Sequence, residues 1–145
     1  MPYYSDCYVH VDSRSSKLGI RLIKTFLPDG ALESAEEYFI PQYAESPKHT
    51  FSKAVDLMNY LEKHPDETHS IYWTSLKDQN PIQVNIHYID TGTILGVAVP
   101  SETEEDQILE RLKSAFNTDC GYITHEAPPP STLDEFIRTL RNIEN

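Results

Sequence analysis

The sequence predicts an α+β fold in which helices pack on one face of a mainly antiparallel sheet. Three observations predict it: an alternating apolar segment near the start of the chain, three strand-like runs in succession within residues 70–100, and amphipathic helical patterns on either side of these runs. Strands that follow one another across short turns pair as an antiparallel meander. A ferredoxin-like order with a helix-rich insertion after the first strand is compatible with this succession, and other strand orders remain open.

The three central runs carry different patterns. Ile71 and Trp73 alternate with more polar neighbours, and residues 82–88 alternate in the same way, so each of these strands should bury one face. Residues 93–99 are apolar on both faces, as in a strand at the buried centre of a sheet. Gly92 permits the positive φ that a short hairpin connection requires.

The N-terminal part is expected to contain one strand and one helix. Cys7, Val9 and Val11 alternate with polar residues, which is typical of a strand with one apolar face. Apolar residues from 18 to 26 then keep helical spacing, up to a stop signal at residues 28–30.

Four basic residues recur at helical spacing in this region and fall within one arc of the expected helix: Arg14, Lys17, Arg21 and Lys24. One interpretation is an anion or phosphate site. We favour a solvated face paired with neighbouring acids, because basic stripes are usual on amphipathic helices.

Residues 31–44 give conflicting signals. Because Pro41 disfavours helical geometry at the residue before it, we expect a short helix that runs into an extended Tyr-Phe-Ile segment. The next helix is clearer, with Thr50 or Ser52 as its cap. The residues expected on its inward side are Ala54, Val55, Met58 and Leu61.

Beyond the central strands, Ser101 and Glu104 form a capping-box pattern, in which the two side chains bond opposite backbone donors. Acidic residues gather in the first turn of the helix expected there, where they complement the helix dipole: Glu102, Glu104, Glu105 and Asp106. Residues 120–126 are a further strand candidate. Three prolines then form a stiff connector, and Ser131 with Asp134 is expected to cap the last helix.

We expect residues 1–145 to form a single globular domain, because this length can bury a sufficient core without disulfides or a metal. The formal net charge of −11, from 23 acidic and 12 basic residues, opposes binding to nucleic acids and anionic membranes. It favours a monomer or a weak homodimer. The sequence shows no N-terminal apolar segment and no run of 18 apolar residues, so we expect no signal peptide or membrane span and a cytoplasmic location.

No stretch carries a catalytic or cofactor motif, since the common nucleotide, zinc-protease and hydrolase signatures are missing from the sequence. Residues 64–69 hold two histidines and two acids, which we interpret as turn chemistry at a helix exit rather than as a metal site. Cys7 and Cys120 are interpreted as small buried side chains that need no disulfide.

Three titratable residues lie on the polar sides of their strands and are candidates for an acid/base cluster: His10, Asp12 and His87. We favour a solvent-exposed sheet face for them, as is common in antiparallel sheets. The sequence therefore predicts no enzyme activity, no cofactor and no metal.

A small, strongly acidic, tyrosine-rich α+β domain without catalytic motifs resembles the immunity proteins that neutralise bacterial polymorphic or contact-dependent toxins. The resemblance implies a basic protein partner, a toxin domain, which acidic and aromatic residues would bind. The first candidate patch, which we prefer because it precedes Pro41 in an irregular segment, comprises Glu33, Glu36, Glu37 and Tyr38. The second comprises Glu102, Glu104, Glu105 and Asp106.

Two other functions remain open from the sequence. One is a small-molecule-binding domain or enzyme that uses the basic stripe, and the other is a regulatory or assembly module that pairs through a sheet edge.

Overall fold

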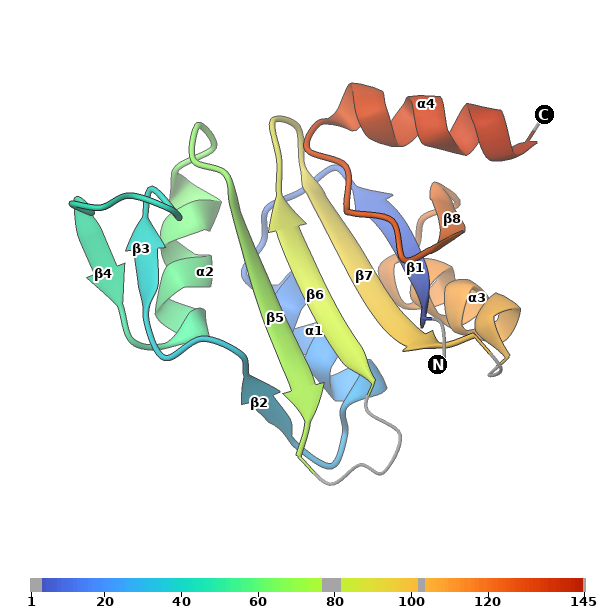
Figure 1. Cartoon of the computed structure of the whole chain (residues 1–145), viewed down its shortest axis with the longest axis horizontal. Helices are drawn as coiled ribbons and strands as arrows, with labels where there is room; N and C mark the ends of the chain where they lie inside the picture. Colours follow the sequence, from blue (N-terminus) through green and yellow to red (C-terminus); the bar gives the residue numbers. More distant parts are fainter. Residues whose placement is uncertain (1–3, 77–81, 102–103, 145) are drawn as a thin grey trace.

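The structure is a computed structural model that describes residues 4–76, 82–101 and 104–144. A six-stranded sheet lies at its centre, with the strand order β2-β5-β6-β7-β1-β8 and antiparallel pairing between all neighbours (Figure 1). These strands are β1 (Tyr4–Val11), β2 (Ala31–Glu33), β5 (His69–Ser75), β6 (Gln83–Tyr88), β7 (Thr93–Pro100) and β8 (Gly121–His125). The predicted α+β fold with an antiparallel meander is confirmed.

A second, two-stranded sheet pairs β3 (Tyr38–Ile40) with β4 (His49–Phe51), and sequence analysis did not anticipate β4. The helices are α1 (Lys17–Phe26), α2 (Ala54–Lys63), α3 (Glu105–Phe116) and α4 (Leu133–Glu144). If the segment from β2 to β5 is set aside as an insertion, the remaining elements follow the β-α-β-β-α-β order of a ferredoxin-like unit, with α4 added after it. This insertion, residues 31–75, differs from the one that the sequence suggested between the first strand and the meander, because it includes β5, the first strand of the meander.

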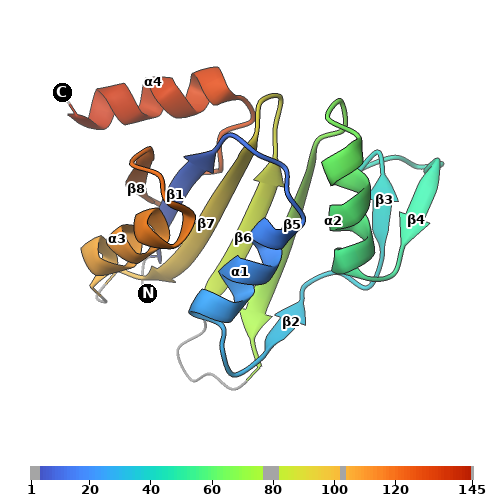
Figure 2. The same cartoon turned by 180° about the vertical axis from the view of Figure 1, so that it is seen from behind.

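The main core lies between the sheet and the helices α1, α2 and α3, which Figure 2 shows on the same side. Alternate residues of each strand point into it, Ile71 and Trp73 from β5 and Leu95 and Val97 from β7. Trp73 is 2% exposed, so the predicted inward face of this strand is confirmed.

The opposite face of the sheet is covered only in part. There α4 places Phe136 in a smaller cluster with Tyr8, Ile94 and Tyr122, which are the alternate residues of β1, β7 and β8. Three helices thus share the expected face, whereas α4 packs on the other and leaves the sheet surface over β5 and β6 uncovered by any helix (Figure 1).

The segment before Pro41 contains no helix. Leu32 pairs with Thr74 across β2 and β5, and Tyr38 pairs with Phe51 across β3 and β4, so sheet pairing overrides the local helical preference. The extended Tyr-Phe-Ile segment is confirmed, and the preceding short helix was wrong.

The inward side of α2 also differs by one position from the prediction. Ala54, Leu57, Met58 and Leu61 are buried, whereas Val55 is 43% exposed. The buried residues follow the i, i+3, i+4, i+7 spacing of one helix face, and Val55 lies outside it. Lys53 occupies the N-cap without a side-chain bond, so neither predicted cap forms.

The capping predictions for the last two helices were also wrong in detail. The helix α3 begins at Glu105, four residues beyond Ser101, and Glu104 occupies its N-cap without a side-chain bond. For α4 the cap is Thr132, whose hydroxyl accepts a hydrogen bond of 3.1 Å from the Glu135 N–H.

Candidate functional site

Two neighbouring depressions occupy the side of the sheet that faces the viewer in Figure 1, and Tyr72 on β5 lines both. The first, of about 380 Å³, is lined by Glu37 and Tyr43 beside β3, and we call it the Tyr43 hollow. The second, of about 530 Å³, lies over β6, β7 and β1 and is lined by Asp6 and Glu126, and we call it the Asp6 hollow. Together they form the open face of the molecule.

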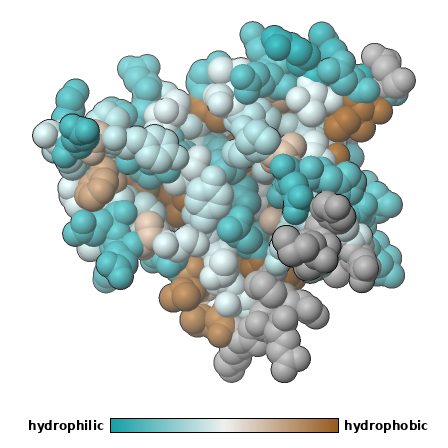
Figure 3. Space-filling view, viewed as in Figure 1, coloured by the Kyte–Doolittle hydropathy of each residue, from teal (hydrophilic) through white to brown (hydrophobic). Residues whose placement is uncertain are grey.

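The open face is acidic and rich in tyrosine. Five tyrosines line the two hollows, of which Tyr8 and Tyr38 are buried: Tyr4, Tyr8, Tyr38, Tyr43 and Tyr72. Among the described residues, no Lys or Arg lines either hollow. Hydrophilic and near-neutral colours prevail over this side in Figure 3. By contrast, a depression between the proline connector and α4 contains both Glu135 and Arg138 and therefore has mixed charge.

A buried chain of hydrogen bonds forms the floor of the open face. The Nδ1 atom of His87 lies 2.7 Å from the Ser70 hydroxyl, and its Nε2 atom lies 2.8 Å from the Asn85 side-chain oxygen. His87 is 3% exposed, and this burial lowers its pKa to about 4. The rings of Tyr8 and Tyr72 are in T-shaped contact with the imidazole, with ring centroids 6.3 and 5.6 Å from its own. The imidazole is therefore neutral at pH 7 and held in one orientation.

The order Ser70, His87, Asn85 matches that of a nucleophile, a base and an orienting group, which makes the chain a candidate for catalysis. Two observations oppose this interpretation. The low pKa makes His87 a weak base near pH 7. The Ser70 N–H, one donor that could stabilise an oxyanion, instead donates a 3.0 Å hydrogen bond to the Gln42 side-chain oxygen. We interpret the chain as a rigid floor.

Gly96 on β7 makes room for this floor. A Cβ atom at Gly96 would lie 2.2 Å from the Asn85 Oδ1 atom and 2.9 Å from the ring of Tyr8. The glycine therefore lets Asn85 and Tyr8 approach each other across the strand that separates them.

Asp6 is held at the edge of the open face by backbone donors. The N–H groups of Glu126 and Ala127 bond its carboxylate, yet burial raises its pKa above the usual value, and the nearby Glu126 adds to the rise. The only ion pair found among the described residues joins Lys113 to Glu110, so Asp6 forms no salt bridge there, although the charge of the nearby His125 favours its ionised form.

The first predicted patch is divided by the fold. One Glu33 oxygen accepts hydrogen bonds from the Tyr38 hydroxyl (2.8 Å) and from the Ala54 N–H at the start of α2 (2.9 Å). Tyr38 is buried. Both residues therefore stabilise the insertion, whereas Glu36 and Glu37 are exposed, and the assignment of this patch to partner binding stays a prediction.

The second predicted patch is divided as well. Glu105 is half-buried and accepts a hydrogen bond from the Ser5 hydroxyl, so it connects α3 to β1. Glu104 and Asp106 are exposed at the start of α3. Glu102 lies outside the described residues.

The basic stripe is not a free cationic surface. Arg14 precedes α1, and its guanidinium donates to four backbone carbonyls, those of Leu61, His64, Glu67 and Ile89, at 2.7 to 3.0 Å. Arg21 donates to the Ala115 carbonyl at 3.2 Å. Lys17 and Lys24 remain exposed on α1. The expectation of one shared arc was therefore wrong for Arg14.

His10 and His87 do not form an acid/base cluster. Both are in register with Ile94, which lies between them on β7, and the His10 Nε2 atom lies 2.7 Å from the Thr91 carbonyl oxygen. Asp12 is exposed just beyond β1. The prediction of a solvent-exposed face was also wrong for His87, which is buried.

The segment 64–69 shows no metal-binding geometry. The ring nitrogens of His69 lie near the carbonyl oxygens of Ser70 (3.1 Å) and Phe39 (3.0 Å), and this side chain is buried. No group of three His, Cys, Asp or Glu residues in the described part of the chain could hold a metal ion.

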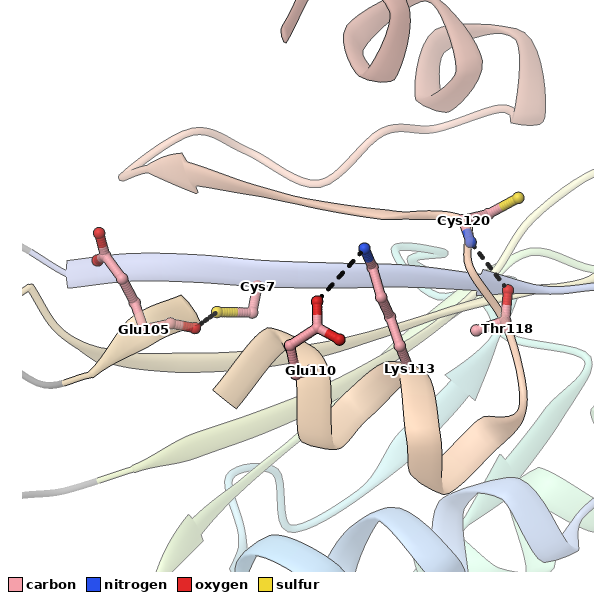
Figure 4. A network of polar contacts seen from close by, with 6 residues as sticks. All are labelled: Cys7, Glu105, Glu110, Lys113, Thr118 and Cys120. Carbon is pink, nitrogen blue, oxygen red and sulfur yellow. Dashed lines mark hydrogen bonds and ion pairs between the residues drawn. The ribbon is translucent and has the colours of Figure 1, made fainter. Parts of the chain in front are cut away.

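The two cysteines are free and lie in different environments (Figure 4). Cys7 is buried against α3, its thiol lies 3.7 Å from the Glu105 carbonyl oxygen, and burial raises its pKa to about 12. Cys120 is exposed just before β8, which corrects its assignment as a buried residue. Its N–H donates to the Thr118 hydroxyl.

Four residues of the open face were not predicted from the sequence as members of a common site: Tyr43, Tyr72, Asp6 and Glu126. One signal was present, because the alternation that pointed Ile71 and Trp73 inward also placed Tyr72 on the opposite face. The contributions of Tyr43 and Glu126 depend on how the insertion and the proline connector fold back over the sheet.

The chain matches no protein-family model, and neither a curated protein nor a solved structure matches it significantly. No helix in the described parts of the chain has both the length and the apolar character needed to cross a membrane.

Proposed function

We propose that this protein is an acidic protein-binding domain, an immunity protein that binds and neutralises a cognate bacterial toxin in the cytoplasm. The observation that supports the proposal is the open face, where tyrosines and carboxylates line two adjoining hollows without a basic side chain among the described residues. Such a surface complements a basic protein and repels an acidic one.

The chemistry of the open face suits protein recognition. Tyrosine supplies a large contact area and a polar tip at a low cost in conformational entropy, and it is enriched among residues that dominate binding energy. Tyr43 is 89% exposed at the rim of its hollow, where it is free to anchor a partner. Glu36, Glu37 and Glu45 are exposed nearby and would accelerate encounter with a basic partner.

The experiment is affinity purification from the native host, with the tagged protein as bait and mass spectrometry as readout. Wild-type protein is compared with the variant Glu36→Lys/Glu37→Lys and with the control Glu110→Lys/Asp119→Lys, which reverses two exposed acids at a different depression. We expect wild type and control to retain the same basic protein and the Glu36/Glu37 variant to lose it.

A retained protein would then be tested as a toxin by expression with and without this chain. Growth arrest that co-expression relieves is the expected result. Recovery of no protein partner, with a small metabolite retained instead, would contradict the proposal in favour of ligand binding.

A further inference from the structure

The Asp6 hollow combines features that an organic cation requires. Two carboxylates, of Asp6 and Glu126, and three aromatic rings, of Tyr4, Tyr8 and Tyr72, line one depression of about 530 Å³. The floor is fixed, because His87 and Asn85 are both 3% exposed and bond each other. The site is thus a preformed hollow with a buried polar base.

Among the described residues no Lys or Arg lines this hollow, and His125 is a neighbour whose charge favours the ionised Asp6 carboxylate. Two backbone N–H groups orient the Asp6 carboxylate, while burial and the neighbouring Glu126 disfavour its negative charge. An incoming cation would offset this repulsion. Tyrosine rings attract the same cation through their negative faces, and the attraction grows as water is excluded.

A guanidinium fits better than an ammonium. Its planar group is weakly hydrated, stacks on aromatic rings and carries five N–H donors that two carboxylates can share. An ammonium is more strongly hydrated and would lose more hydration free energy on entering a hollow lined by aromatic rings.

We propose that the Asp6 hollow binds a single guanidinium group, supplied by an arginine side chain of the basic partner. The source of the arginine rests on the proposed function, whereas binding of the guanidinium itself does not. The same chemistry could come from a free guanidino compound, so the experiment includes both sources.

The test is a calorimetric and NMR titration of the full chain with three probes: N-acetyl-L-arginine amide, its neutral isostere N-acetyl-L-citrulline amide, and free agmatine. We expect the capped arginine to bind with a dissociation constant on the order of millimolar, and the capped citrulline at least about 10-fold more weakly. NMR shifts should concentrate at Asp6, Tyr72 and the side-chain amide of Asn85. Micromolar binding of agmatine would support the Asp6 hollow as a guanidinium site and would indicate that its ligand is a free compound.

Two variants test the named groups. Asp6→Asn keeps the shape of the side chain and should weaken the binding of capped arginine about 10-fold. Tyr72→Leu should weaken this binding about 5-fold. Asp119→Asn, at an exposed acid in a different depression, is the matched control and should leave binding unchanged. Equal affinity for arginine and citrulline, or an unaltered affinity in Asp6→Asn with wild-type thermal stability, would overturn the inference.

The two proposals fail separately. Loss of guanidinium binding leaves the partner and its dependence on Glu36 and Glu37 untouched. Failure to recover a protein partner leaves a guanidinium site whose ligand is a free compound.

Discussion

The Nε2 atom of His87 lies 2.8 Å from the Oδ1 atom of Asn85, two residues earlier on the same strand. With Ser70 at the other ring nitrogen, this arrangement suits an imidazole that accepts a hydrogen bond from the hydroxyl and donates one to the amide oxygen. A protonated ring would turn that acceptor into a donor in a buried site. The floor of the open face is therefore built for the neutral form.

We predict that the protein loses stability in acid through His87. Its pKa falls from 6.5 in the unfolded chain to about 4 in the folded one, so the unfolded state takes up the proton first. The contribution of neutral His87 to the free energy of unfolding is fully present above about pH 6.5. It is lost as the pH falls from about 6.5 to 4, and the total loss is roughly 3 kcal/mol. Burial lowers the pKa of His69 as well, which acts in the same direction.

Denaturant unfolding of wild type and His87→Gln across this pH range measures the effect. The difference between their unfolding free energies should shrink as the pH falls, whereas His49→Gln, at an exposed position, should follow wild type. If the unfolding free energies of wild type and His87→Gln changed in parallel with pH, His87 would not be held neutral in the folded protein.

Arg14→Lys should destabilise the fold by about 2–4 kcal/mol. The guanidinium satisfies four carbonyls at the C-terminal end of α2, in the following loop and beyond β6, and one ammonium cannot reach all four. Arg21→Lys loses a single exposed bond and should cost less than about 1 kcal/mol. Equal losses in the two variants, measured by urea unfolding, would refute the structural role of Arg14.

Trp73→Ala should cost about 3–5 kcal/mol, because it removes a large side chain from the core between β5 and the helices. Tyr43→Ala, at an 89% exposed position, is the control and should stay within about 0.5 kcal/mol of wild type. Thermal and urea unfolding give both values. A loss below about 1 kcal/mol for Trp73→Ala would mean that this strand faces the other way.

Cys120 should react with iodoacetamide in the native protein, and Cys7 only after unfolding. The Cys7 thiol is buried and its pKa is raised to about 12, so little thiolate forms and reagent cannot reach it. Peptide mapping by mass spectrometry distinguishes the two sites. Native labelling of Cys7 as fast as that of Cys120 would contradict this assignment and reopen its role as a nucleophile.

Periodicity predicted the fold class and the meander because the alternation of apolar and polar residues within each central strand indicates which face is buried. It failed for residues 31–37, where the pairing of Leu32 with Thr74 comes from a strand far along the chain. Local sequence carries no signal for such a partner. The same limit applies to Glu33, whose acidic side chain looked available for binding but caps α2 through the Ala54 N–H.

The open face could be predicted in part. Alternation predicts that Tyr72, Asn85 and His87 lie on one side of adjacent strands. It does not predict that α4 covers the neighbouring strands and leaves this part of the sheet uncovered. Arg14 shows the opposite error, since its helical spacing suggested a solvated position paired with neighbouring acids, whereas its guanidinium donates to four distant carbonyls.

The central claim, that the acidic open face recognises a basic protein, is tested most directly by the association rate constant of the co-purified partner. It should fall as ionic strength rises from about 0.01 to 0.15 M, where the Debye length shrinks from about 30 to 8 Å. At low salt, Glu36→Lys/Glu37→Lys should associate at least about 10-fold more slowly than wild type, and Glu110→Lys/Asp119→Lys should match wild type. An association rate that is independent of salt and equal in all three proteins would contradict the account.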